Sequence, residues 1–143
     1  MKIMVSACLL GKKCKYSGGD NRNDAVISFL KDKDYVAVCP EVAAGMPIPR
    51  PPVEIRKGRI ISIEGKDLDE TYREGVRKTL EKAGPVDMAI LKGGSPTCGV
   101  HMIYDGTFSG TKIPGKGLLA QALYEKGIPL YDEKDMERIY GGK

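Results

Sequence analysis

Short apolar runs, each followed by a turn, constrain the fold of this chain more than any other feature. The run KIMVSA at residues 2–7 is apolar on both faces and rich in β-branched side chains. This pattern is typical of a strand buried on both sides of a parallel sheet, because a half-exposed strand would alternate. Further strands are predicted within YVAVC at 35–39, VDMAILK at 86–92 and IPLYDE at 128–133.

Helical segments alternate with these strands. The first is predicted to begin at a cap, Asn23 or Asp24. A long helix is predicted from about Asp67 to Ala83, with acidic residues first and lysine last, which complements the helix dipole. The last helix is predicted at 118–127. The alternation predicts one three-layer α/β domain over residues 1–143, with a mostly parallel, Rossmann-like or flavodoxin-like sheet.

Three loop regions complete the prediction. Residues 40–55, PEVAAGMPIPRPPVEI, contain five prolines and are predicted to form an extended, stiff loop without regular helix. Residues 53–65 indicate two short strands around the turn KG. Residues 104–117, YDGTFSGTKIPGKG, are crowded with glycine and are predicted to form a mobile loop.

Composition excludes some classes of function. Apolar residues make up 41% of the chain and charged residues 29%, and no apolar run approaches the roughly 20 residues of a membrane span. The start of the chain reads as a first strand and not as a secretion signal, so we expect a cytoplasmic protein that does not bind membranes. The net charge of +4 is spread along the sequence, which favours simple solubility over a nucleic-acid surface.

Cysteines follow the predicted strands. Cys8 and Cys39 come directly after apolar runs, and Cys98 follows one by a short glycine-rich turn. Because ligands bind outside the carboxyl ends of parallel strands, we expect these three thiols to converge on one pocket. Convergent thiolates indicate a soft metal, and the close C-x-x-C pair of a structural zinc site is absent from the sequence. An iron–sulfur cluster, zinc and buried inert cysteines all remain possible from the residues alone.

Polar residues near these cysteines are candidates for catalysis. Glu41, two residues after Cys39, is predicted to act as an acid or base, although an exposed glutamate would give the same pattern. Ser95 and the amides of GGSPTCG are predicted to donate hydrogen bonds, although the segment also fits a plain turn. His101, the single histidine, favours a structural role.

Three further residues are candidates for substrate binding. Arg50 stands between two pairs of prolines, so its guanidinium is predicted to grip a carbonyl or phosphate, or else to pack internally. Lys92 ends the third strand, and Ser109 lies in the glycine-rich loop. Together with Tyr104 and Asp105, this loop is predicted to act as a lid or to be a disordered connection.

Six local patterns together resemble one known family. They are SACLLG, C-K-Y-S-G, VCPE, PRPPVEI, ILKGGSPTCG and IYDGTFSG, in that order along nearly the whole chain. They resemble the short four-cysteine family, long described as a domain of unknown function, that includes thiouracil desulfidases. The family's usual DVT before the long helix is DLD here, and the aromatic residue that follows is Tyr72. Neither departure touches a cysteine pattern.

The resemblance implies a cofactor and a reaction. Members with this activity resemble enzymes in which three cysteines hold a four-iron four-sulfur cluster and one iron stays open. The implied ligands are Cys8, Cys39 and Cys98, and the implied reaction is non-redox removal of sulfur from thiouracil or a related thiolated base. Glu41 is then expected to move protons.

Cys14 is expected to differ from the other three cysteines. It lies in a loop beside Lys12, Lys13 and Lys15, which are predicted to favour its thiolate and make it reactive. With three cysteines on the cluster, Cys14 is free to assist catalysis or to pack.

Two other functions remain open. In one, all four cysteines close a metal-binding or redox-sensing site. In the other, the protein is a zinc-dependent hydrolase or uses Cys8 and Cys14 as a thiol pair. The expected partner is a small thiolated base; an RNA substrate stays open, and no oligomeric state is predicted.

Overall fold

A four-stranded parallel sheet forms the centre of the structure, a computed structural model that describes residues 1–141. The strand order is β2-β1-β5-β8, and all three neighbouring pairs are parallel. These results confirm the predicted α/β class and the four predicted strand regions. The strands are β1 (Lys2–Ser6), β2 (Asp34–Val38), β5 (Met88–Leu91) and β8 (Leu130–Asp132).

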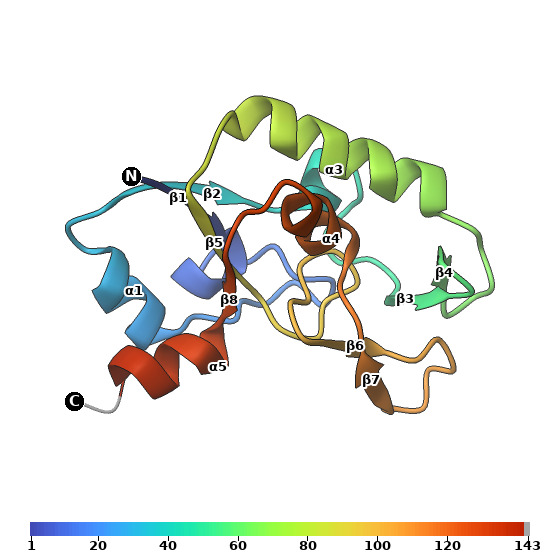
Figure 1. Cartoon of the computed structure of the whole chain (residues 1–143). Helices are drawn as coiled ribbons and strands as arrows, with labels where there is room; N and C mark the ends of the chain where they lie inside the picture. The colour runs from blue at the N-terminus through green and yellow to red at the C-terminus, as the bar shows by residue number, and fades with distance from the viewer. Residues whose placement is uncertain (142–143) are drawn as a thin grey trace.

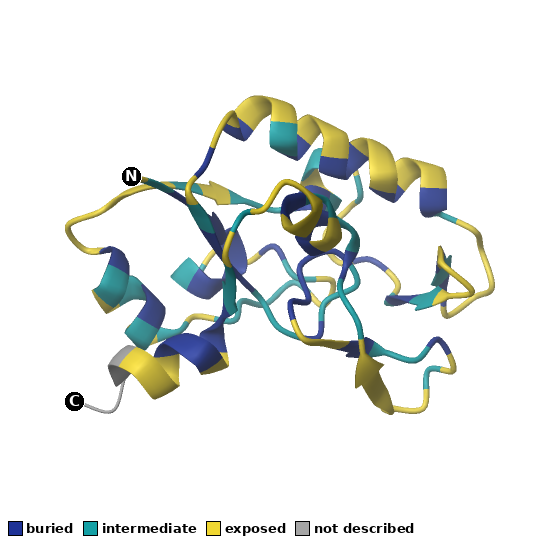
Figure 2. Ribbon diagram, viewed as in Figure 1, coloured by how far each residue is buried: buried dark blue, intermediate teal, exposed yellow. Residues whose placement is uncertain are grey.

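Helices cover both faces of this sheet (Figure 1). Alternate strand residues point to opposite faces, so Met4 and Leu91 belong to one core cluster, and Ile3 and Ile90 belong to another. Figure 2 shows α3 buried along its inner side and exposed on its outer side. The first cluster lies under α3 (Asp69–Ala83) and α4 (Leu118–Glu125), and the second lies under α1 (Asp24–Leu30) and α5 (Glu133–Met136).

Local hydrogen bonds explain where two helices begin. Asn23 caps α1, since its side chain accepts a hydrogen bond from the Val26 amide at 3.1 Å. α3 begins two residues later than predicted. The Leu68 amide donates to the Ile60 carbonyl at 2.9 Å, and the Asp67 side chain accepts from the Asp69 amide at 3.0 Å. These bonds keep the preceding residues outside the helix.

The proline-rich segment is not wholly extended, so that prediction was wrong in part. A short helix, α2 (Pro40–Ala43), starts directly after Cys39. Proline is tolerated at the first helical position because the helix has no use for an amide hydrogen there. The other four prolines follow α2, where the chain runs on without helix to β3 (Val53–Arg56).

Two antiparallel ribbons flank the main sheet (Figure 1). β3 pairs with β4 (Arg59–Ser62) around the turn KG, as predicted. The glycine-rich segment, predicted as a mobile loop, instead contributes to a second ribbon of β6 (Met102–Tyr104) and β7 (Lys112–Pro114). This ribbon could not be predicted from the local sequence, because the loop is bound by side chains from β3, about 50 positions earlier in the sequence.

α4 is not the last helix of the chain, which is another correction. α5 follows β8, because the Asp132 side chain caps it and the Asp135 carboxylate accepts a hydrogen bond from the Asp132 amide. A helical turn, η2 (Glu137–Gly141), continues from α5. None of the helices in residues 1–141 is both long enough and apolar enough to cross a membrane.

Candidate functional site

A cavity of about 490 Å³ opens at the carboxyl ends of β1, β2 and β5. Ser6, Val38 and Lys92 mark these three strand ends in its lining. β2 lies on one side of β1 and β5 lies on the other, so the loops that follow these strands diverge at this point. The cavity therefore lies where open parallel sheets usually bind ligands.

All four cysteines line this cavity. Cys8 lies on η1 (Ala7–Leu10), the 3-10 turn directly after β1, and Cys39 joins β2 to α2. Cys98 lies in the turn after β5, and Cys14 comes from the loop after η1. The structure thus brings together the three thiols that follow strands and adds the fourth.

Cys14 forms hydrogen bonds with two of the other cysteines. These bonds lower the pKa of Cys8 and lower that of Cys39 to about 6. The same contacts, first with Cys39 and then with Cys8, raise the pKa of Cys14. The Cys39 thiol also lies 3.9 Å from the Cys14 carbonyl oxygen. Cys14 therefore retains its proton more firmly than Cys8 or Cys39 does.

The expectation that lysines make Cys14 an exposed, reactive thiolate was wrong. Cys14 is only 1% exposed, whereas Lys12 and Lys13 face solvent. Its carbonyl oxygen accepts a hydrogen bond from Arg50 Nη2 at 2.7 Å. The chain therefore turns Cys14 inward, away from Lys12 and Lys13, whereas Lys15 lines the same cavity.

The turn that carries Cys98 is organised by Ser95. The Ser95 hydroxyl oxygen accepts hydrogen bonds from the amides of Thr97 and Cys98, at 3.1 and 3.0 Å. The Thr97 hydroxyl lies 3.8 Å from the Cys98 sulfur. Burial raises the pKa of Cys98 to about 12. Ser95 thus both lines the cavity and fixes the direction of the Cys98 backbone.

An ion pair between Glu41 and Arg50 forms part of the cavity wall. Arg50 Nε donates to Glu41 Oε1 at 2.9 Å, and the Arg50 side chain is only 1% exposed and that of Glu41 12%. Arg50 also donates to the carbonyl oxygens of Pro47, at 3.2 Å, and Cys14, at 2.7 Å. The Thr97 hydroxyl lies 3.4 Å from Glu41 Oε2. Arg50 therefore uses its guanidinium internally, which fits the packing role that the sequence left open.

α3 supports this wall from behind through two residues that the sequence did not single out for a role in the site. Gly75 allows α2 to lie directly on α3, because a Cβ at this position would lie 2.6 Å from the Ala44 Cβ. Tyr72 is 1% exposed, and its hydroxyl is a buried polar atom without a hydrogen-bond partner in residues 1–141. Burial, followed by the charge of Glu41, raises the pKa of Tyr72. Gly75 within the helical pattern of α3 was the signal in the sequence for a close contact, but not for its partner.

The remaining predicted residues lie in different environments. Lys92 lines the cavity, but its ammonium group is paired with Glu133 Oε2 at 2.8 Å. Tyr104 also lines the cavity. Ser109 is exposed, and its hydroxyl bonds to the side chains of Thr107 and Thr111, so the structure does not bring it into the described lining.

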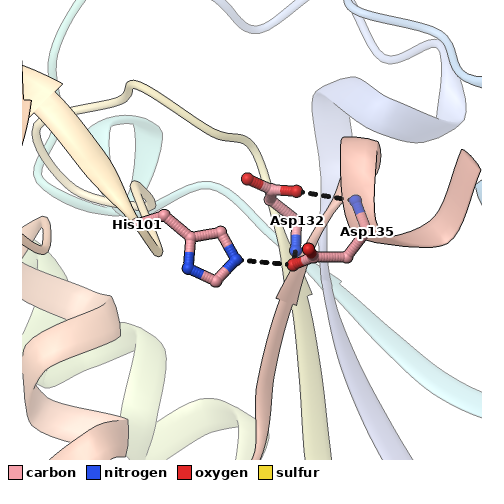
Figure 3. A group of neighbouring side chains, drawn as sticks. All are labelled: His101, Asp132 and Asp135. Atoms are coloured by element: carbon pink, nitrogen blue, oxygen red, sulfur yellow. Dashed lines mark hydrogen bonds and ion pairs between the residues drawn. The ribbon is translucent and has the colours of Figure 1, made fainter. Parts of the chain in front are cut away.

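His101 belongs to a second group of potential metal ligands (Figure 3). The ligand atoms of His101, Asp132 and Asp135 lie within 4.8 Å of one another. His101 Nε2 lies 2.7 Å from Asp135 Oδ2, which also accepts from the Asp132 amide at 2.9 Å. Arg138 Nη2 donates to the other oxygen of Asp135 at 2.7 Å. These bonds cap α5, so the contacts of His101 fit a structural role.

The fold and the cavity together define a class of protein. Four thiols at the switch point of a parallel α/β sheet are a donor set of the kind that holds soft metals or metal clusters. The sequence matches the 2-thiouracil desulfurase family over residues 3–135, and the chain belongs to that family. The family resemblance predicted from the sequence is confirmed.

Two known proteins are similar to almost the whole chain. YbbK, an uncharacterized protein of Bacillus subtilis strain 168, is 37% identical over 149 residues, covering 96% of this chain and 99% of the relative. A solved structure of TudS (DUF523Vcz), described as a [4Fe-4S]-dependent thiouracil desulfidase, has a TM-score of 0.87 and 34% identity. That similarity covers 96% of this chain and 93% of TudS.

Proposed function

We propose that this protein is a [4Fe-4S]-dependent desulfidase that hydrolyses the thiocarbonyl group of thiouracil or a related thiolated base. The observation that carries the proposal is the convergence of four thiols and the paired carboxylate of Glu41 on one cavity. Family membership and the similarity to TudS support it. The reaction consumes one water and gives one carbonyl product and one hydrogen sulfide, with no change of oxidation state.

Cys8, Cys39 and Cys98 would hold the cluster. They approach the cavity from three different strand ends, and thiolates are the protein ligands of iron–sulfur clusters. A tetrahedral zinc ion at about 2.3 Å from each sulfur needs thiolates within about 4 Å of one another. The sequence has no C-x-x-C pair, the usual source of two such neighbouring thiolates, and the similarity to TudS supports the cluster. When bound, the cluster supplies a soft iron centre that attracts the thiocarbonyl sulfur.

Glu41 would act as the proton carrier of the reaction. As water adds to the thiocarbonyl carbon, Glu41 takes a proton from that water, and the carbon–sulfur bond then breaks as the carbonyl forms. Arg50 holds Oε1 and Thr97 reaches Oε2, so the carboxylate keeps one orientation. The sulfur leaves as hydrogen sulfide, because it receives both the proton held by Glu41 and the hydroxyl proton that the intermediate loses as the carbonyl forms. Ser95 would orient the substrate through its hydroxyl at the edge of the same cavity.

Cys14 would serve the site as a proton-bearing thiol and not as a ligand. It is buried between Cys8 and Cys39, and both contacts favour its neutral form. Its contacts lower the pKa of Cys8 and Cys39, which favours the thiolate form in which these two residues would bind iron. A sensing site with four cysteine ligands is the competing function, since Cys14 lines the same cavity.

Anaerobic reconstitution tests the proposal. The protein is purified without oxygen and loaded with iron and sulfide. Iron content, visible absorption, and the hydrogen sulfide and uracil formed from 2-thiouracil are then measured. We expect about four irons per chain for one cluster, a broad visible band and equal amounts of both products. Colourless protein with one zinc per chain and no product would contradict it. Thiouridine and thiolated RNA, in the same assay, define the substrate class.

A further inference from the structure

Two side chains of β3 fasten the tip of the β6–β7 ribbon. Glu54 is only 9% exposed, and its Oε1 accepts hydrogen bonds from the amides of Gly106, at 2.9 Å, and Phe108, at 3.1 Å. Arg56 donates through both Nε and Nη2 to the Gly106 carbonyl, at 2.9 and 2.7 Å. We call Glu54 and Arg56 the β3 clamp. It holds both the amide and the carbonyl of one loop residue.

Gly106 brings the loop backbone against the backbone of β3. Its φ is +93°, and a Cβ at this position would lie 2.7 Å from the Ile55 carbonyl oxygen. A side chain would therefore push the loop away from the strand. The β3 clamp and this close approach together fix the position of the residues that follow.

Phe108 has a backbone conformation that phenylalanine rarely adopts. Its φ is +56°, in the left-handed region where glycine carries no steric penalty. The chain has only two phenylalanines, and it places one of them at this strained position. Phe108 lines the cysteine cavity and is half-buried. A strained residue held by its surroundings at a cavity wall points to a functional need for that side chain.

Phe108 is better suited to contact a substrate than the other aromatic residues of the cavity. Tyr104 has the Lys112 ammonium 5.3 Å from the centre of its ring, which occupies one of its faces. Tyr16 is 48% exposed. Phe108 instead is partly buried, and its backbone amide is held by Glu54 of the β3 clamp. A planar, weakly polar heterocycle gains most from such a rigid aromatic wall.

We propose that Phe108 is a substrate-positioning residue whose ring stacks on the planar thiolated base, and that the β3 clamp holds the ring in place. The inference rests on the proposed function and names the residue that selects planar aromatic substrates. Stacking acts equally on substrate and product bases, because both are planar pyrimidines. It therefore contributes to binding and not to the breaking of the carbon–sulfur bond.

Substitution by glycine separates stacking from a purely structural role. Phe108→Gly removes the ring and also the backbone strain, so we expect an unchanged or raised Tm and unchanged iron content. KM for 2-thiouracil should rise about tenfold with little change in kcat, since one stacked base contributes on the order of a tenfold or larger factor in affinity. Calorimetric binding of uracil should weaken by a similar factor, with or without the cluster. Phe108→Tyr, which keeps a ring, should restore both values.

Other outcomes overturn the inference. A Phe108→Gly protein that binds uracil and 2-thiouracil like the wild type shows that the ring does not stack, whatever its Tm. If that variant does not fold, Phe108→Leu keeps the apolar volume without the ring and must still raise KM about fivefold. Wild-type protein that releases no hydrogen sulfide and binds no base removes the proposed function itself. Normal wild-type turnover with unaffected variants removes only the role of Phe108.

The β3 clamp has its own conservative control. Glu54→Gln keeps an amide oxygen that can accept from both loop amides, so KM should stay within about twofold of the wild type. Glu54→Ala leaves these two amides without their acceptor and should raise KM about as much as Phe108→Gly, with iron content unchanged. Equal KM values for the two Glu54 variants would show that the clamp does not position the ring.

Discussion

Two groups of side chains that bind metals in other proteins lie at the carboxyl end of the sheet, and they differ in how their hydrogen bonds are satisfied. His101, Asp132 and Asp135 are close together, but the Asp135 carboxylate is already occupied by donors from His101, Asp132 and Arg138. The four cysteines are spread around a cavity of about 490 Å³. The ligand atoms of the first group are close together but are already hydrogen-bonded. The cysteines of the second group surround a space that a metal group can fill.

The comparison also separates stability from function. The acidic group completes a capping box at the start of α5 and thereby closes the core that lies under α1. The cysteine group leaves four free thiols and a paired carboxylate around an open cavity, with the unsatisfied Tyr72 hydroxyl behind its wall. Unsatisfied or perturbed groups in a cavity are the usual mark of a functional site, because a protein gains no stability from them.

Loss of a cluster ligand should have the largest effect. Cys39→Ser is expected to remove the iron–sulfur absorption and all release of hydrogen sulfide, because a serine hydroxyl is a poor ligand for the cluster. Asp135→Asn, in the other group, should keep both and lower only the Tm. Iron analysis and the sulfide assay on the two proteins in parallel check this. Iron loss in Asp135→Asn instead would reverse the assignment of the two groups.

Removal of the charge on Glu41 should lower turnover without removing the cluster. Glu41→Gln is expected to keep the full iron content and to lower kcat by about 10² to 10⁴, the usual contribution of a general acid or base. Glu70→Gln, on the exposed side of the first turn of α3, is the matched control and should leave kcat unchanged. Full turnover in Glu41→Gln at normal iron content would remove this residue from the mechanism.

The contact between α2 and α3 should tolerate no side chain at Gly75. Gly75→Ala places a Cβ against Ala44, so α2 must shift or the helices must separate. We expect a loss of about 1–3 kcal/mol of stability, as for other overpacked sites, and a lower kcat because α2 carries Glu41. Gly19→Ala is the control, since its Cβ meets only the flexible end of Lys15. Chemical denaturation and turnover of both variants measure the difference.

The smallest effect concerns pH and the acidic group. Burial alone would raise the pKa of Asp135, but hydrogen bonds from the Asp132 amide, His101 and Arg138 outweigh it and lower this pKa. The corresponding stability is present above the unfolded value of about 3.9 and is lost as the pH falls below it. Asp135→Asn should therefore flatten the dependence of Tm on pH in the acid range. An unchanged acid profile in this variant would show that another carboxylate is responsible.

Much of the fold follows from local sequence. Runs such as KIMVSA predict buried parallel strands, and parallel strands bring their carboxyl ends to one edge. The convergence of Cys8, Cys39 and Cys98 could therefore be expected without a structure. Caps such as Asn23 are equally local, because the side chain and the amide it binds are three residues apart.

The remaining features depend on contacts distant in sequence. Arg50 donates to a carbonyl 36 positions earlier, and this bond helps to turn Cys14 inward against the pattern of its neighbouring lysines. The many glycines of the loop after β6 predict mobility. The loop sequence alone does not indicate its contact with Glu54, which lies 52 positions earlier. Asp132 and Asp135 form the capping box of α5, but the same residue types are equally typical of an irregular polar segment.

Isotopic labelling tests the central claim most directly. Reconstituted protein is mixed with 2-thiouracil in water enriched in ¹⁸O, without reductant, and the uracil is analysed by mass spectrometry while hydrogen sulfide is measured. Hydrolysis at the cysteine cavity predicts one ¹⁸O atom in each uracil and one hydrogen sulfide per uracil, and no product from Cys39→Ser. Product that lacks ¹⁸O, or that forms only when a reductant is added, would contradict a hydrolytic desulfidase.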